Sequence, residues 1–280
     1  PFCASAFVVP QPDWKPGRHP YHHAGAFYAQ EPSASAPAAL LDVHPGMRVA
    51  DLCAAPGGKS TQIADHLAGK GVLVTNEIHP ARARILLENI ERMGVTNAIV
   101  TNEDTARLAA AMPGQFDRVL VDAPCSGEGM FRKEAVAAAQ HNNALVAHCA
   151  ELGAEILENA AALLAPGGVL VYSTCTILRR ENEDVVRAFL AAHPGFSLEH
   201  MQRLYPHSSP GEGHFVARLR RAGDGFCPQE ALPLKPCRDV AYHSAIADLF
   251  IQPPEGCAYD LPDGRIAILR APLPHGLSAL

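Results

Sequence analysis

The sequence lacks an apolar run long enough to cross a bilayer, and no signal peptide stands at its start. It also lacks a Cys-x-x-Cys pair, and its eight cysteines are scattered along 280 residues. This spacing argues against the dense disulfide framework of small secreted domains and against a structural zinc site. We therefore expect a reducing, cytoplasmic environment, no membrane association and no bound metal.

A basic excess is missing as well, because the formal net charge at pH 7 is -6. Proteins that bind nucleic acid through its phosphates usually carry a basic footprint, which the bulk charge here does not supply. Local pairs of cations do occur, Arg132 with Lys133 and Arg179 with Arg180. They are either solvated faces or phosphate contacts. The chain begins at Pro1 rather than at methionine, and we expect a fragment of a longer protein.

Strand-like and helical patterns alternate along most of the chain. The buried-strand patterns lie at residues 48–52, 72–77, 97–101, 117–122 and 168–173. This alternation predicts an α/β fold, with a mostly parallel sheet and helices on both faces. A hairpin near 196–198 and 214–219 brings the count to seven strands. We divide the chain into a truncated lead-in (1–46), a main domain (47–221) and a small β-rich appendage (222–280), in which Asp263-Gly264 is a hairpin turn.

The first strand runs into a glycine-containing loop at residues 53–59. Gly57 and Gly58 let a ligand approach the backbone, and the helix that follows points its free N–H groups at an anionic group. Glu77 ends the second strand, where an acid suits a ribose diol, and Asp104 follows the third, where it could accept from an adenine amino group. The loop matches neither GxGxxG nor a P-loop. It predicts an adenosine-containing cofactor with a carboxylate or phosphate, and the alternative is a tight turn without a ligand.

Two cysteines directly follow buried strands. Cys125 follows the strand that ends at Asp122, and Cys175 follows the strand at 168–173. Ligands of open α/β sheets bind outside the carboxyl ends of the strands, so both thiols should face one crevice. A thiol near positive charge has a lowered pKa and becomes nucleophilic, and Lys59 or Arg179 and Arg180 could supply that charge. Together with the cofactor loop, the two thiols suggest covalent catalysis.

Three motifs in this order resemble the NOL1/NOP2/Sun family of RNA 5-methylcytosine methyltransferases. They are Asp51-Leu52-Cys53-Ala54-Ala55-Pro56-Gly57-Gly58-Lys59, Asp122-Ala123-Pro124-Cys125-Ser126-Gly127 and Ser173-Thr174-Cys175-Thr176. Three further segments are similar to the bacterial small-subunit rRNA methyltransferases of the F type. These are Tyr28-Ala29-Gln30-Glu31-Pro32-Ser33-Ala34, Glu128-Gly129-Met130-Phe131-Arg132-Lys133 and Gly211-Glu212-Gly213-His214-Phe215-Val216-Ala217. The resemblance covers about residues 21 to 221.

The resemblance implies a Rossmann-like methyltransferase fold and S-adenosylmethionine as methyl donor. It implies that Cys175 attacks C6 of a cytidine, that Cys125 assists release and that Asp122 and Lys59 act on the base. The residues implied to hold the cofactor are Cys53, Ala54, Ala55, Pro56, Gly57, Gly58, Lys59, Glu77, Asp104 and Asp122. Arg132, Lys133, Arg179 and Arg180 would bind RNA phosphates.

The implied substrate is 16S ribosomal RNA, free or within the small subunit, and we expect a monomer. The cysteine mechanism serves any pyrimidine C5, so a uridine or transfer RNA methyltransferase stays open. A non-catalytic RNA- or cofactor-binding protein on the same fold also stays open, because a fold does not establish activity. A thiol-redox function fits less well, since 50 residues separate Cys125 from Cys175 and no Cys-x-x-Cys pair exists.

Overall fold

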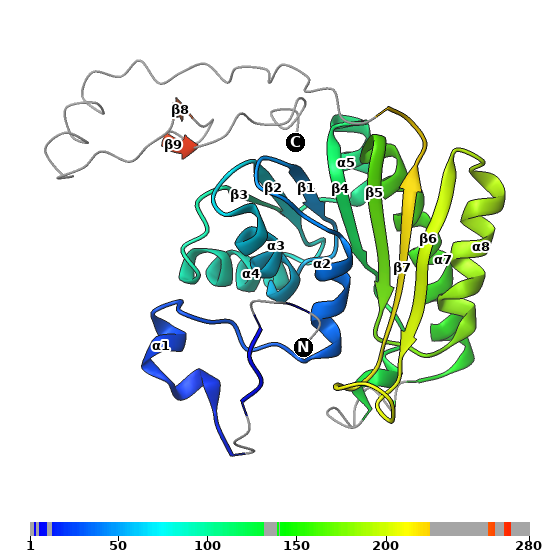
Figure 1. Cartoon of the computed structure of the whole chain (residues 1–280), viewed down its shortest axis with the longest axis horizontal. Coiled ribbons are helices and arrows are strands. Elements are labelled where there is room, and N and C mark those ends of the chain that lie inside the picture. The colour runs from blue at the N-terminus through cyan, green and yellow to red at the C-terminus, as the bar shows by residue number, and fades with distance from the viewer. Residues whose placement is uncertain are drawn as a thin grey trace, which may run out of the picture.

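A seven-stranded sheet organises the protein (Figure 1). The computed structural model describes residues 3, 6–9, 13–131, 139, 141–224, 257–260 and 266–269. The strand order is β3-β2-β1-β4-β5-β7-β6. The strands are β1 (Arg48–Asp51), β2 (Val72–Asn76), β3 (Ala98–Thr101), β4 (Phe116–Asp122), β5 (Leu164–Thr174), β6 (Phe196–Leu204) and β7 (His214–Arg221). The first five pair in parallel, whereas β7 pairs antiparallel with β5 and with β6.

Helices cover both faces of the sheet, because alternate strand residues are apolar on each side. One face packs against α2 (Ala36–Leu40), α3 (Gly58–Leu67) and α4 (Pro80–Arg92). The other packs against α5 (Thr105–Ala111), α7 (Asn143–Leu163) and α8 (Glu183–Ala192). In β1, Val49 faces the first layer and Ala50 the second, and both are fully buried. The predicted α/β fold with a mostly parallel seven-stranded sheet is confirmed.

Short helical turns connect and precede the sheet. In the lead-in these are η1 (Pro16–Arg18), α1 (Pro20–His23) and η2 (Ser33–Ser35), and after β4 and β5 come η3 (Glu128–Met130) and η4 (Arg179–Glu181). Figure 1 places the lead-in at the edge where β4 and β5 end. The lead-in therefore borders the crevice in which the sequence predicts the ligands.

The hairpin predicted after α8 is present and longer than expected. β6 extends to Leu204, and β7 pairs with it along its whole length. Farther along, β8 (Cys257–Asp260) and β9 (Ile266–Leu269) pair antiparallel, while the predicted turn at Asp263-Gly264 lies outside the described residues. The predicted domain boundaries stay a prediction. Within the described ranges, no helix has the length and apolarity to cross a membrane.

Candidate active site

Hydrogen bonds to the end of β2 and to α4 fix the loop at residues 53–59. Ala54 donates its N–H to the carbonyl oxygen of Asn76 over 2.8 Å, which ties the loop to the end of β2. From α4, Arg82 donates to the carbonyl of Ala55 over 3.0 Å and Asn89 to that of Pro56 over 2.9 Å. Gly57 precedes α3 with φ of 116°, a left-handed conformation that glycine adopts without strain. The loop therefore presents a fixed backbone at the start of α3.

Three buried polar side chains, Asp51, Ser60 and Thr75, are joined by hydrogen bonds next to this loop. The hydroxyl of Ser60 lies 2.7 Å from Oδ2 of Asp51 and 2.6 Å from the hydroxyl of Thr75, so α3 is joined to β1 and β2. Burial raises the pKa of Asp51 to about 7, against the bond from Ser60. Burial, with the nearby carboxylates, also raises the pKa of Cys53, so that side chain stays a thiol. Cys53, the first residue of the loop, packs against the core.

The raised pKa of Asp51 predicts a pH-dependent stability. Between pH 4 and 7 the folded chain holds a proton on Asp51 that the unfolded chain releases, so the free energy of unfolding falls as pH rises through this window. Asp51→Asn should remove that slope and raise stability at pH 8 by on the order of 3 kcal/mol. Urea unfolding from pH 4 to 8 measures both. Asp65→Asn, the same change at an exposed position of α3, should leave the slope intact. Equal slopes in wild type and Asp51→Asn would contradict the assignment.

The carboxylate predicted to bind a ribose follows β2. Glu77 is 2 % exposed, accepts the N–H of His79 over 2.9 Å and pairs with Arg82 over 3.2 Å. Next to it, the side chain of Ile78 is 53 % exposed, an apolar surface beside a fixed carboxylate. Asn102 donates to the carbonyls of both residues, over 2.6 and 2.9 Å, and so fixes this corner. Ile78 and Asn102 were missed by the sequence reasoning, although each directly adjoins a predicted strand end.

Asp104 has a structural task as well as an exposed position. Its Oδ1 accepts the N–H of Ala106 over 2.7 Å and caps the start of α5. The predicted hydrogen bond from an adenine amino group to Asp104 stays a prediction. The carboxylate would then accept from the adenine as well as from the N–H of Ala106.

Three elements converge on the carboxylate of Asp122 at the end of β4. Lys59, from α3, lies 2.7 Å from Oδ2, and the hydroxyl of Ser173, from β5, donates to Oδ1 over 2.7 Å. Nε2 of His214, the first residue of β7, lies 3.4 Å from the same Oδ1. Lys59 and Asp122, distant in sequence, thus form a largely buried ion pair at the end of β4.

This ion pair stays charged. Burial alone would raise the pKa of Asp122, but the charge of Lys59 and the bond from His214 outweigh it and hold that pKa well below its usual range. Burial likewise would lower the pKa of Lys59, but Asp122 raises it. A fixed carboxylate with a fixed ammonium can orient a polar ring that enters the crevice.

The two predicted thiols are in contact. Sγ of Cys125 lies 3.1 Å from Sγ of Cys175. A hydrogen bond from the Cys125 thiol lowers the pKa of Cys175, helped by the charge of Lys59, and the same bond raises the pKa of Cys125. This hydrogen bond makes the two thiols unequal, because it favours the thiolate form of Cys175 and the thiol form of Cys125.

A network of carboxylates joins the loops that carry the two thiols. Glu181 accepts from both the N–H (2.8 Å) and the hydroxyl (2.5 Å) of Ser126, next to Cys125. Glu128 accepts the hydroxyl of Thr176, next to Cys175, over 2.9 Å. Glu181 is 1 % exposed, and the sequence reasoning missed it because nothing in η4 marks it apart from a surface acid. The network fixes the separation of the two sulfur atoms.

Gly129 packs directly against the backbone of Cys175. Its N–H donates to the carbonyl of Cys175 over 2.8 Å, and an added Cβ would lie 2.5 Å from that oxygen and 3.0 Å from the carbonyl of Gly213. Gly129→Ala must therefore displace Cys175. We expect kcat of the methyl transfer that the family resemblance implies to fall about 10- to 100-fold, because small misplacements of a reacting group are costly. Gly195→Ala, where an added Cβ meets nothing within 4 Å, is the matched control. Equal activity of both variants in a radiolabel transfer assay would contradict the prediction.

The predicted phosphate-binding cations are only partly described. Arg179 pairs with Asp184 over 2.9 Å at an exposed position, and Arg180 is exposed beside it. Arg132 and Lys133 lie outside the described residues. Ser173 and His214 are site residues that the sequence reasoning missed. Ser173 begins the quoted motif at 173–176 and His214 lies in the quoted segment at 211–217, but neither was given a role, because their contacts with Asp122 depend on how β5 and β7 are placed.

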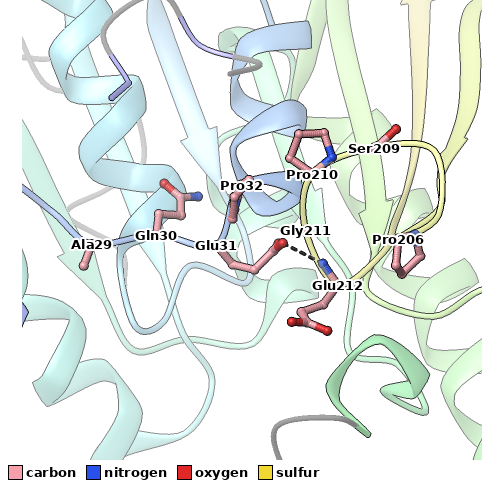
Figure 2. Close-up of a pocket in the computed structure, with 9 residues that line it drawn as sticks. All are labelled: Ala29, Gln30, Glu31, Pro32, Pro206, Ser209, Pro210, Gly211 and Glu212. Atoms are coloured by element: carbon pink, nitrogen blue, oxygen red, sulfur yellow. Dashed lines mark hydrogen bonds between the residues drawn. The ribbon is translucent and has the colours of Figure 1, made fainter. Parts of the chain in front are cut away.

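An open pocket of about 640 Å³ borders the site. Figure 2 shows residues 29–32 of the lead-in on one side and the loop at 206–212, between β6 and β7, on the other. The carboxylate of Glu31 crosses from one to the other and accepts the N–H of Glu212 over 2.7 Å. The pocket is therefore built by two segments that lie far apart in the sequence.

Comparison with protein families decides what this arrangement is. The model of the family described as 16S rRNA methyltransferase RsmB/F matches residues 38–220. The chain belongs to this family. The family predicted from the three motifs is thereby confirmed, and the matched range includes the residues described above from Asp51 to His214.

Curated relatives and solved structures agree with the RsmB/F assignment. The chain is 38% identical over 242 residues to the ribosomal RNA small subunit methyltransferase F of Serratia proteamaculans, covering 79% of this chain and 51% of that protein. It thus spans about half the length of the curated relatives it matches. NSun6 from Pyrococcus horikoshii, solved with SFG, superposes with a TM-score of 0.67 at 31% identity, covering 74% of this chain and 56% of that one. A methyltransferase homolog protein from the same organism gives 0.65 at 29%, covering 75% and 72%.

Proposed function

We propose that this protein methylates C5 of a cytidine in 16S ribosomal RNA with S-adenosylmethionine. The observation that carries the proposal is the contact between Cys125 and Cys175 beside the ion pair of Lys59 and Asp122. Two thiols of unequal acidity next to a fixed carboxylate suit covalent addition to a pyrimidine. The names of the curated relatives, small subunit methyltransferase F, support ribosomal RNA as the substrate.

The residues of the cofactor loop fit S-adenosylmethionine. Gly57 and Gly58 carry no side chain where the methionine part would approach, and the start of α3 lies beside them. Glu77 would accept from the ribose diol, and the exposed face of Ile78 would cover the adenine ring. When bound, the cofactor supplies the methyl group from a sulfonium centre.

The thiolate of Cys175 adds to C6 of the cytosine, and the electron pair of the 5,6 double bond moves to make C5 nucleophilic. Asp122, fixed by Lys59, Ser173 and His214, accepts from the amino group of the ring, and from N3 when that atom takes up a proton as Cys175 adds to C6. After C5 has gained the methyl group, its proton leaves to a base. The bond between Cys175 and C6 then breaks, and the double bond returns. Cys125, 3.1 Å from Cys175, is positioned to assist this release.

The base must leave its stack to reach Cys175, because Cys175 is only partly exposed and follows a strand in the interior of the sheet. A single-stranded loop or an extruded nucleotide of the ribosomal RNA meets this need. Arg179 and Arg180, and by the sequence motif Arg132 and Lys133, are proposed to contact its phosphates.

The decisive experiment uses 16S RNA labelled with tritium at C5 of cytidine, incubated with this chain and S-adenosylmethionine. Methylation at C5 releases the tritium to water, and mass mapping of the digested RNA locates the methyl group. RNA labelled at C5 of uridine serves as the matched substrate. Release from uridine but not from cytidine would replace the proposed substrate base, and release from neither would contradict a C5 methyltransferase.

A further inference from the structure

We propose that the pocket between residues 29–32 and 206–212 binds the base of the nucleotide next to the target cytidine in the RNA strand. This inference rests on the proposed function and names a part of its substrate that the catalytic residues do not contact. Figure 2 shows the two walls facing each other, with the hydrogen bond from the N–H of Glu212 to Glu31 running between them. Its volume, about 640 Å³, lies within the range of small-molecule sites.

Both walls adjoin groups that contact the catalytic carboxylate. On one wall, Gln30 packs so closely on Gly58 that an added Cβ there would lie 3.3 Å from the Gln30 amide carbon. Gly58 is followed by Lys59, which pairs with Asp122. On the other wall, Glu212 stands two residues before His214, whose ring contacts the same carboxylate. A base bound in the crevice therefore has the pocket as its neighbour.

The pocket is separate from both predicted ligand sites. Its lining comprises Ala29, Gln30, Glu31, Pro32, Pro206, Ser209, Pro210, Gly211 and Glu212. None of these is a residue of the cofactor loop, Glu77, Asp104 or a catalytic residue. The target base and the cofactor are proposed to bind at other residues. The nucleotide next to the target base is the part of the RNA that can reach this pocket.

The charge of the lining favours a base over a phosphate. Two carboxylates, Glu31 and Glu212, belong to it, and its described lining contains neither Lys nor Arg. Burial would raise the pKa of Glu31, but bonds from Ser33, Glu212 and Ala34 lower it below its usual range, so Glu31 is ionised at neutral pH. A negative potential repels phosphate and attracts the N–H donors on the edges of nucleobases. Proline rings at 32, 206 and 210 offer apolar surface to such a base.

The construction of the pocket is rigid enough to select a ligand. Besides Glu212, the carboxylate of Glu31 accepts the N–H and the hydroxyl of Ser33, over 3.2 and 2.6 Å, and the N–H of Ala34 over 2.8 Å. At Gly211, φ is 117°, and an added Cβ would lie 2.0 Å from Oε1 of Glu31. The two walls can approach each other this closely because residue 211 is a glycine.

Binding measurements test the proposal independently of the chemistry. The probes are short single-stranded RNAs with one cytidine. One RNA is intact, a second lacks the base on the 5′ side of the cytidine, and a third lacks the base on its 3′ side. We expect the wild-type chain to bind the abasic RNA about tenfold more weakly for one of the two sides. Fluorescence anisotropy gives the dissociation constants.

Filling the pocket should remove this difference. Ser209→Trp and Ala29→Trp, one on each wall, should weaken binding of the intact RNA about tenfold and leave the abasic RNA equally weak. Ser208→Trp and Ala26→Trp, exposed neighbours outside the lining, should bind as the wild type does. Circular dichroism confirms that each variant is folded, and two walls give two independent tests.

Either of two results would overturn the pocket assignment: filled variants that bind intact RNA as tightly as the wild type, or filled variants that keep the full abasic penalty. Failure of the proposed function looks different. In that case RNA binding depends on the pocket as expected, while no tritium leaves C5 of cytidine.

Discussion

Replacing Cys175 with alanine should abolish methyl transfer, with kcat reduced about 10³-fold or more, because the step that makes C5 nucleophilic is lost. We propose Cys175 as the attacking thiol because it matches the family motif at 173–176, and the hydrogen bond from Cys125, which lowers the pKa of Cys175, is consistent with that role. Binding should change little, since Asp122 and Lys59 still face the base. The assay is transfer of a labelled methyl group to 16S RNA, with RNA affinity measured in parallel.

Cys149→Ala is the matched control, since Cys149 is a buried core thiol on α7. It should leave kcat within about twofold, although burying a smaller side chain costs stability. Full activity of Cys175→Ala would remove the nucleophile from the proposed mechanism. It would direct attention to Cys125, the other thiol of the contacting pair.

Replacing Cys125 with alanine should have a different effect. The bond between Cys175 and C6 of the cytosine should still form, but the RNA should not be released from it. Cys175 still adds to C6 and the methyl group still reaches C5, but the partner positioned to assist departure is gone. Protein covalently linked to RNA should accumulate and survive a denaturing gel. We expect the trapped fraction to approach the RNA supplied, while the wild type shows almost none.

The double variant Cys125→Ala with Cys175→Ala separates this result from non-specific linkage, because it has no nucleophile to form the bond. If Cys125→Ala is slow but no adduct accumulates, the Cys125 thiol acts in a step other than release of the RNA. Loss of the Cys125 hydrogen bond also raises the pKa of Cys175, so the adduct should form faster as pH rises from 7 to 9.

Sequence patterns predicted the parallel part of the sheet well, because β1, β2 and β4 are largely buried and each contains a short apolar stretch, as at residues 72–74 and 119–121. They also placed Cys125 and Cys175 together, since both follow strands that are neighbours in the sheet. The ends of β6 were underestimated. Most of that strand is exposed or half-buried, so its polar residues give no apolar run to recognise.

The site was less predictable where a contact depends on tertiary placement. Asp104 reads equally well as a ligand acid and as a helix cap, and the cap is visible only once α5 begins beside it. His214 lies 92 residues from Asp122, on the one strand that runs against the others. No local pattern encodes that proximity.

The placement of β7 between β5 and β6 has a consequence for how the protein matures. The carboxylate of Asp122 has partners at residues 59, 173 and 214, so the site is assembled from segments that lie up to 155 residues apart in the sequence. A chain emerging from the ribosome has its donor loop and both thiols long before the last strand can insert. Its nascent forms should therefore hold an unfinished centre, competent only when synthesis has passed the closing hairpin.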